Sequence, residues 1–471
     1  MKQTWIWTLR IVLLLTILNS CQSDETLAVP TRVSVQDFVW KGLNLYYLWQ
    51  DQVPNLADTQ FASQSDLTTF LNTQSDPKVL FNNLLYQYGT VDRFSYITSD
   101  YTTLENTLIG SNKSTGMSYG LRYKTGSTTD VFGWVRYVLP NSSAATKGVL
   151  RGMLFYAVNG TALTKDNYGT LLNQDSFSIQ LANYDQGAIT PNGQTISLSR
   201  SQIAENPVNM TRIFNQGTQK VGYLLYNGFY TPYENDLNQA FAFFANSGIT
   251  HLVLDLRYNP GGSIATATRL ASMITGQFNG QVFAKQLWNS KMQAYFQSQG
   301  SATTTNYFTT TLSNGAGIQS LQLPKVVILT SKSTASASEL VINGLKPYIQ
   351  VTQIGDVTVG KNVGSVTLYD SPDFSANNRN PSHQYAMQPL VLKTANAAGF
   401  ADYQTGLVPD VQWPEDVSNL GVLGDTSDPL LQAALTYISQ HGRLAAPKKT
   451  VETPVADDRD LWPGFNGLQI P

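Results

Sequence analysis

Cysteine is almost absent from this chain, which has a single one, Cys21, among its 471 residues. Without a second thiol, an internal disulfide, a CxxC redox motif and a cysteine-rich metal site are all excluded. Charged residues are also sparse, at 13%, and the formal net charge is −2. A chain with so little positive charge has no basic field for holding phosphate backbones, so nucleic acid is excluded as a partner.

Histidine is scarce too, and the three that occur, His251, His383 and His441, form no H-E-x-x-H pair. No G-x-S-x-G elbow is present, so a histidine-based catalytic triad has little support. Residues 355–361 match the opening of a phosphate-binding P-loop, but Asn362 stands where that motif needs Ser or Thr. The residues that follow indicate a strand where a P-loop requires a helix. Nucleotide binding is therefore excluded as well.

The N-terminus combines positive charge with a short apolar run. Lys2 and Arg10 precede apolar residues 11–18, and the run ends in the sequence LNSC at residues 18–21. The run is too short to span a bilayer, and this order of features is typical of a secretory signal. It resembles a bacterial lipoprotein signal, in which Cys21 would carry the lipid. The alternative is an uncleaved anchor that ends in an incidental cysteine.

The lipoprotein resemblance implies a signal peptide over residues 1–20 and a polar tether over residues 21–32. The mature protein is then expected in a bacterial cell envelope, at the periplasmic or outer-membrane surface. Its contact with the membrane would be a lipid anchor on Cys21.

The length predicts several domains, because one hydrophobic core rarely extends beyond roughly 250–300 residues. Residues 33–104 have apolar side chains at helical spacing and predict a small helical domain. Residues 105–205 consist of short β-rich runs broken by Gly, Asn and Ser, which predicts a β domain. Residues 206–440 alternate strand-like runs with helical patterns, as a layered α/β unit does. Residues 441–471 have no periodicity and are expected to be a loose tail.

Over residues 137–161, a short helix of small residues is expected before a Gly-led turn, a strand and the tight turn Asn159-Gly160. This middle segment resembles the central stretch of a PDZ domain. PDZ domains bind chain ends by adding the peptide as a strand and holding its carboxylate on backbone N–H groups. The resemblance implies that Tyr119, Gly120 and Leu121 form this peptide-binding loop. The alternative is a β domain that only packs against its neighbour.

Two further segments carry the chemistry. Residues 251–262 (HLVLDLRYNPGG) indicate a buried strand that runs into a tight Gly-Gly turn. Residues 333–339 (STASASE) begin a helix and are followed by VTVGK at residues 357–361. Together they closely resemble the C-terminal processing peptidases, or tail-specific proteases, a family of Ser/Lys enzymes with a PDZ domain. The resemblance continues through GLVPD at residues 406–410 and DPLLQ at residues 428–432.

The resemblance assigns the nucleophile to Ser336 and the general base to Lys361. A serine hydroxyl is a weak nucleophile until a base takes its proton, and a lysine amine can do so if burial keeps it neutral. The oxyanion hole is expected from the backbone N–H of Ala337 and one from Gly261 or Gly262, where the backbone must approach the substrate closely.

Three further positions complete the implied site. Glu339 and Thr358 fall on positions that the family uses, as supports. Ser365 stands where many relatives have a glutamine that orients the lysine, so the third catalytic member is open between this hydroxyl and another residue. No metal and no cofactor are implied.

The sequence thus predicts an α+β multidomain protein with a helical N-terminal domain, a PDZ-like β domain and a crotonase-like layered α/β protease core. It is expected to be a serine endopeptidase that cleaves exported proteins through an acyl-enzyme on Ser336, recognising substrates near a C-terminus. The alternative, which Ser365 favours, is an inactive relative that binds proteins or peptides as a cell-surface lipoprotein.

Overall fold

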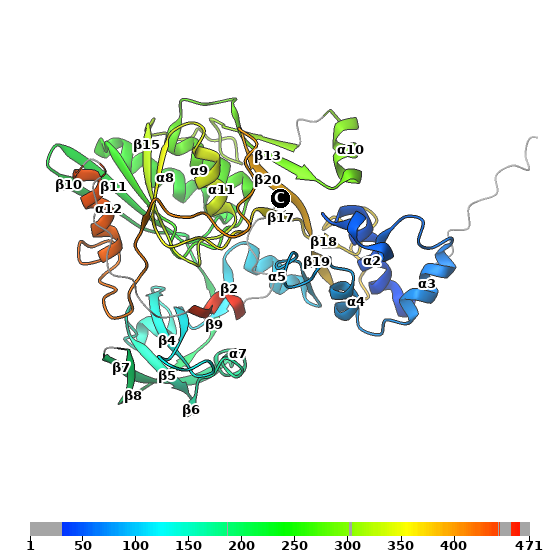
Figure 1. The fold of residues 1–471 in the computed structure, drawn as a ribbon, viewed down its shortest axis with the longest axis horizontal. Coiled ribbons are helices and arrows are strands. Elements are labelled where there is room, and N and C mark those ends of the chain that lie inside the picture. Colours follow the sequence, from blue (N-terminus) through cyan, green and yellow to red (C-terminus); the bar gives the residue numbers. More distant parts are fainter. Residues whose placement is uncertain (1–30, 186, 301–303, 441, 443–453, 462–471) are drawn as a thin grey trace, which may run out of the picture.

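The computed structural model describes residues 31–185, 187–300, 304–440, 442 and 454–461. Figure 1 shows a central α/β core, a group of N-terminal helices at one side of it, and a β domain at another side. Each of these regions has its own cluster of buried hydrophobic side chains. The structure therefore has the mixed α/β, multidomain architecture that the sequence predicts.

The core is built on a six-stranded sheet. In spatial order its strands are β10 (Val208–Gln216), β11 (Gln219–Tyr226), β12 (His251–Asp255), β15 (Lys325–Thr330), β16 (Gln350–Gly355) and β21 (Val411–Gln412). β10 pairs antiparallel with β11, and each later pairing in the sheet is parallel. Parallel neighbours need long crossover connections, which is why strand and helix patterns alternate in this part of the sequence.

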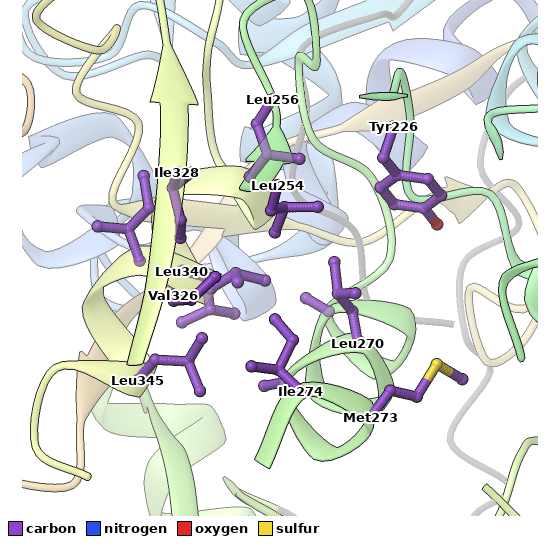
Figure 2. Close-up of a cluster of buried hydrophobic side chains, with 14 of the residues drawn as sticks. Tyr226, Leu254, Leu256, Leu270, Met273, Ile274, Val326, Ile328, Leu340 and Leu345 are labelled. Atoms are coloured by element: carbon purple, nitrogen blue, oxygen red, sulfur yellow. The ribbon is translucent and has the colours of Figure 1, made fainter. Parts of the chain in front are cut away.

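Helices cover both faces of the six-stranded sheet. One face is covered by α8 (Glu234–Ser247), which follows the 3-10 turn η4 (Thr231–Tyr233), and by α9 (Ile264–Thr275) and α11 (Ala337–Leu345). Figure 2 shows their contact with the sheet, where Leu270 and Ile274 of α9 and Leu340 of α11 face Leu254 and Ile328. α12 (Pro429–Ser439) packs on the opposite face. Two covered faces explain the nearly continuous apolar character of β12 and β15.

A four-stranded sheet extends the core toward the N-terminal helices. Its order is β14 (Thr305–Tyr307), β13 (Val282–Trp288), β20 (Leu390–Asn396) and β17 (Val363–Ser365), and α10 (Ser290–Ser298) follows β13. These strands pair antiparallel. β17 leads directly away from Lys361, so this sheet fixes one side of the lysine-bearing loop.

The N-terminal region is helical, as the sequence predicts, but it also takes strands from the later part of the chain. Its elements are η1 (Thr31–Val33), α2 (Ser34–Tyr46), η2 (Gln50–Gln52), η3 (Pro54–Leu56), α3 (Gln64–Asn72), α4 (Pro77–Asn83), β1 (Tyr96–Thr98) and α5 (Tyr101–Leu108). β1 pairs with β19 (Ala386–Gln388), which pairs with β18 (Leu368–Tyr369). Leu368 and Met387 lie within the hydrophobic cluster of this region. Residues far apart in the sequence therefore share one core.

The β domain is a mixed assembly of strands and two short helices. Its sheet contains β3 (Met117–Tyr123), β4 (Val131–Val138), β5 (Leu154–Val158), β7 (Ser176–Asp185) and β8 (Ala188–Ser199), with β6 (Thr161–Ala162) beside β5; β2 (Ser111–Ser114) pairs separately with β9 (Ser201–Ala204), and the helices are α6 (Ser143–Thr146) and α7 (Tyr168–Leu172). The predicted hairpin at Asn159-Gly160 is confirmed, since β5 and β6 pair around it and both residues have positive φ.

The C-terminal segment corrects the prediction of a loose tail. Residues 454–461 form β22 (Pro454–Asp457) and the 3-10 turn η6 (Asp458–Leu461), and β22 is the edge strand next to β3 in the β-domain sheet. In Figure 1 this red segment lies where the β domain meets the core. A strand this short has no periodic pattern of its own, and it is formed by its pairing partner.

The described residues include no helix long and apolar enough to cross a membrane. The predicted signal peptide and lipid-bearing Cys21 lie outside the described residues.

Candidate active site

The candidate site forms where two neighbouring parallel strands end. β12 and β15 are paired, and each leads at its carboxyl end into a turn and a helix, α9 or α11. The first turn holds Asn259 and the glycine pair, and the second holds Ser336. Asn259 joins the two turns, because its backbone carbonyl accepts the Ala335 N–H (3.1 Å) and the Ser338 hydroxyl (3.0 Å). The carboxyl ends of parallel strands are the usual place for a site in such sheets.

Ser336 is the N-cap residue of α11 and has a strained backbone. Its φ is 63° and its ψ is −113°, a combination that residues with a Cβ seldom adopt. Such strain persists only where the surroundings hold it, and it concentrates at functional sites. Ser336 is 1% exposed, and its Oγ makes no hydrogen bond within the described part of the chain. The hydroxyl is therefore buried and held in an unusual position at the first turn of α11.

Glu339 connects the turn that carries Ser336 to the loop that carries Lys361. Its Oε2 accepts the backbone N–H of Ser336 (2.6 Å) and that of Lys361 (2.8 Å). Its Oε1 accepts the Gly360 N–H (2.7 Å) and the Thr358 hydroxyl (2.5 Å). Burial raises the pKa of this carboxyl, and these four hydrogen bonds oppose the rise. One buried carboxylate thus fixes the two turns relative to each other.

Lys361 follows β16 and is 2% exposed. Its Nζ has no hydrogen-bond partner among the described residues and lies 4.9 Å from the centre of the Phe94 ring. Burial lowers the pKa of the Lys361 ammonium to about 7; Asp92 and Glu339 oppose this shift, and Arg93 adds to it. Desolvation disfavours the charged form of an amine, so near neutral pH this side chain can exist without its proton.

Gly261 and Gly262 have φ values of 108° and 137°, and neither position has room for a side chain. A Cβ on Gly261 would lie 2.7 Å from the Cβ of Ser336, and one on Gly262 would lie 2.4 Å from a backbone carbonyl oxygen. The Gly261 N–H already donates to the side-chain Oδ1 of Asn259 (2.9 Å). Of the two glycines that the sequence left open as donors beside Ala337, this bond favours Gly262.

The structure brings together Ser336, Lys361, Glu339 and Thr358 through the hydrogen bonds of Glu339. Thr358 reaches the site through Glu339, and its hydroxyl also accepts the Leu407 N–H (2.7 Å). Ser365 is buried on β17, but because Lys361 Nζ has no hydrogen-bond partner in the described residues, Ser365 does not hold the amine here.

Several residues of the site escaped the sequence reasoning. Asp92, Arg93 and Phe94 come from the N-terminal region, and Arg93 Nη2 donates to the carbonyl oxygen of Gly360 (3.1 Å) although 267 positions separate the two residues. No local motif marks these positions. The only sequence signal for Asn259 is its place before Pro-Gly-Gly, where Asn side chains often hydrogen-bond the backbone two residues on.

A buried charge cluster supports the glycine turn from behind. Arg257 is fully buried and pairs with Asp255 (2.7 Å), Asp428 (2.8 Å) and Glu415 (3.1 Å). A buried guanidinium needs several acceptors, because leaving one buried charge unpaired is strongly destabilising. This explains why two separate motifs, at residues 251–262 and 428–432, meet in space.

Tyr119, Gly120 and Leu121 lie on β3 and are covered by the C-terminal segment. Leu121 is paired with Ala456 and Gly120 with Asp457, and the Tyr119 N–H donates to Asp458 Oδ1 (3.1 Å). The same segment, together with Lys361 and Ala335, lines a cavity of about 260 Å³. The residues expected to bind a substrate peptide therefore pair with a segment of their own chain, residues 454–461.

Comparison with known proteins connects this fold and site to one class of enzymes. Residues 220–376 match the model described as Peptidase family S41, and residues 34–96 match the Peptidase S41 N-terminal domain. A candidate S41 protease of solved structure from Bacteroides fragilis NCTC 9343 shares 27% identity and a TM-score of 0.67, over 86% of this chain and 98% of that one. The core and the N-terminal region thus each match a model of peptidase family S41.

Two curated relatives carry names of processing proteases. The chain is 24% identical over 252 residues to a carboxyl-terminal-processing protease of Picosynechococcus sp., and the match covers 54% of this chain and 53% of the relative. It is 26% identical over 316 residues to a chloroplastic C-terminal processing peptidase of Tetradesmus obliquus, covering 64% and 61%. The chain thus matches between half and two thirds of the length of these relatives.

Proposed function

We propose that this protein is a serine endopeptidase of the C-terminal processing type, with Ser336 as nucleophile and Lys361 as general base. The observation that carries the proposal is the single oxygen of Glu339, Oε2, which accepts the backbone N–H of both residues. This bond pattern holds a strained serine and a lysine with a pKa near 7 in one buried site. The match to the peptidase family S41 model and the names of the curated relatives favour the same activity.

The residues supply each step of acyl transfer. Neutral Lys361 takes the proton of the Ser336 hydroxyl while Oγ attacks the carbonyl carbon of the scissile peptide bond. The resulting oxyanion is stabilised by the N–H of Ala337, the first residue of α11, and by that of Gly262. Collapse of the intermediate expels the amine, which takes the proton back from Lys361. Water then hydrolyses the acyl-enzyme by the same route.

Substrates are expected to be exported proteins that enter as extended chains. The β domain, as a PDZ-like unit, would present a segment near the substrate's C-terminus by pairing it with Tyr119, Gly120 and Leu121 on β3. The core would be the crotonase-like layered unit of the family. A lipid on Cys21 would hold the enzyme in the bacterial cell envelope, at the periplasmic or outer-membrane surface.

A binding protein without catalysis is the second candidate. It is favoured by Ser365 at the position of the lysine-orienting glutamine, and by Lys361 Nζ having no hydrogen-bond partner in the described residues. Such a protein would hold peptides on the β domain and leave them intact.

Labelling by a fluorophosphonate probe separates these candidates. The enzyme reading predicts one adduct on Ser336 and none in Ser336→Ala, which should lose peptide cleavage by at least about a thousandfold. Its melting temperature should stay within a few degrees, because only one unpaired hydroxyl is removed. Ser338→Ala is the matched control and should still be labelled on Ser336. The Ser338 hydroxyl donates a hydrogen bond to the Asn259 carbonyl oxygen and is not the proposed nucleophile. An unlabelled wild type, or undiminished turnover by Ser336→Ala, would contradict the proposal.

A further inference from the structure

The C-terminal segment, residues 454–461, binds the β domain in the way that a peptide ligand adds to a sheet edge. β22 runs antiparallel to β3, with Pro454 opposite Arg122, Ala456 opposite Leu121 and Asp457 opposite Gly120. Strand addition uses main-chain hydrogen bonds for affinity and side-chain pockets for specificity. Both features can be followed along this segment.

The first specific contact is an ion pair that also involves the nucleophile turn. Arg136 Nη1 donates to Asp457 Oδ2 (2.8 Å), and Arg136 Nη2 donates to the Ser333 hydroxyl (2.8 Å). The Ser333 hydroxyl in turn donates to the same Asp457 oxygen (3.0 Å). Arg136 is almost fully buried, so this pair is poorly screened by solvent. An acidic side chain at this position thus bridges β4 of the β domain and the turn that carries Ser336.

The next two residues enter the junction between the β domain and the core. Asp458 Oδ1 accepts the Ser118 hydroxyl (3.0 Å). Arg459 is buried and donates to the carbonyl oxygen of Tyr258, next to the Asn-Pro-Gly-Gly turn, and to the Tyr137 hydroxyl (2.9 Å). The segment therefore contacts the catalytic core as well as the β domain.

The last described residue of the segment, Leu461, supplies an apolar anchor. It lines a small pocket of about 30 Å³ together with Met117, Tyr119, Leu172 and Phe177. Leu461 also packs against the hydrophobic cluster of the β domain. An acidic residue and, four positions later, an apolar residue are thus received by two separate sites beside β3, which together are called the β3 groove.

We propose that residues 454–461 are a tethered ligand of this groove, which narrows access to Lys361 until a peptide of the same kind displaces it. The displacing peptide is an extended segment of a protein substrate, with an acidic residue facing Arg136 and an apolar residue four positions further on. The effect on cleavage rests on the proposed function. The binding of residues 454–461 to the groove does not depend on catalysis. A tethered ligand competes at a high effective concentration, so an added peptide binds more weakly while the tether is docked.

The test uses the full chain in the Ser336→Ala background, with a fluorescent peptide of sequence PVADDRDL, that of residues 454–461. Asp457→Lys removes the ion pair, and the double variant Asp457→Lys with Leu461→Asp removes both anchors. Fluorescence anisotropy should give peptide binding at least about tenfold tighter in these variants than in the parent chain. Without added peptide, amide hydrogen exchange of residues 117–123 should be faster in these variants than in the parent chain. Asp166→Lys, the same charge change on an exposed residue of the β domain, should alter neither.

The outcomes separate this inference from the proposed function. Equal peptide affinity and unchanged exchange of residues 117–123 in the double variant would overturn the tethered ligand, whatever the catalytic activity. Tighter binding in the double variant, without peptide cleavage when Ser336 is restored, would leave the tethered ligand standing and overturn the protease. Faster cleavage by the double variant than by the wild type is the result expected if both hold.

Discussion

Lys361 is the residue on which the proposed mechanism depends, because a general base must lose its proton inside the protein. Its burial lowers the pKa to about 7, whereas the same side chain in an unfolded chain titrates near 10.5. The Phe94 ring faces the Lys361 side chain. The charges of Asp92 and Glu339 oppose the lowering of its pKa but do not cancel it. The site therefore favours the neutral amine, and below pH 10.5 this lowers the free energy of unfolding.

We expect Lys361→Met to stabilise the protein at pH 7 by about 2 to 4 kcal/mol, given about 1.4 kcal/mol per unit of pKa. Between pH 7 and 10.5 the unfolded wild type binds more protons than the folded one, so its stability rises with pH across this window. The advantage of Lys361→Met should thus be full below pH 7 and shrink toward pH 10. Urea unfolding at several pH values measures it.

Lys346→Met, at an exposed position just after α11, is the matched control and should show no such pH dependence. A Lys361→Met protein that is less stable than the wild type at pH 7 would contradict the account of a desolvated lysine. So would one that is more stable by the same amount at every pH.

At the scale of elements, the glycine turn decides how closely two backbones approach. Gly261 lies against Ser336 and Ala337, and its N–H is held by Asn259. A side chain here would meet backbone atoms that belong to the strained nucleophile turn. The turn therefore acts through its shape as well as through its N–H groups.

We expect Gly261→Ala to reduce cleavage at least about a hundredfold, because its Cβ would lie 2.7 Å from the Ser336 Cβ and 3.0 Å from the Ala337 nitrogen. Gly280→Ala is the matched control, since Gly280 also has a positive φ but no atom within 4 Å of the added Cβ. Both variants should lose about 1 kcal/mol of stability through the positive φ, and Gly261→Ala should lose more because of the close contacts of its Cβ. Steady-state kinetics and thermal unfolding measure the two effects, and an active Gly261→Ala enzyme would show that the turn tolerates a side chain.

The elements near the site could be predicted where their signal is local. The serine-rich residues 333–339 predict the start of a helix, and the structure has α11 at Ala337–Leu345. β22 could not be predicted, since its strand conformation depends on pairing with β3 rather than on its own pattern. The same limit applies to Phe94, which reaches Lys361 only because the N-terminal region packs on the core.

At the scale of the whole molecule, the site is assembled by three regions of the chain. The core supplies Ser336 and Lys361, the N-terminal region covers the lysine, and the β domain with residues 454–461 borders the cleft. This arrangement links access to the site with the position of the β domain.

The proposed placement of the whole molecule in the cell depends on a lipid on Cys21. We expect Cys21→Ser to move the protein from the membrane fraction to the soluble fraction, because lipidation needs the thiol and the apolar run before it is too short for a stable span. Fractionation followed by an alkaline carbonate wash measures this, with Ser23→Ala as the control that keeps the thiol. A Cys21→Ser protein that withstands the wash in the membrane would contradict the lipid anchor.

The central claim is that Lys361 accepts the proton of Ser336, and single-turnover acylation by an activated peptide ester across a pH series tests it most directly. The wild type should acylate faster as pH rises, with a midpoint near pH 7 as the amine loses its proton. Lys361→Arg keeps the charge but holds its proton at any usable pH, so it should be as inactive as Lys361→Ala. Substantial acylation by a folded Lys361→Arg protein would contradict the Ser/Lys mechanism.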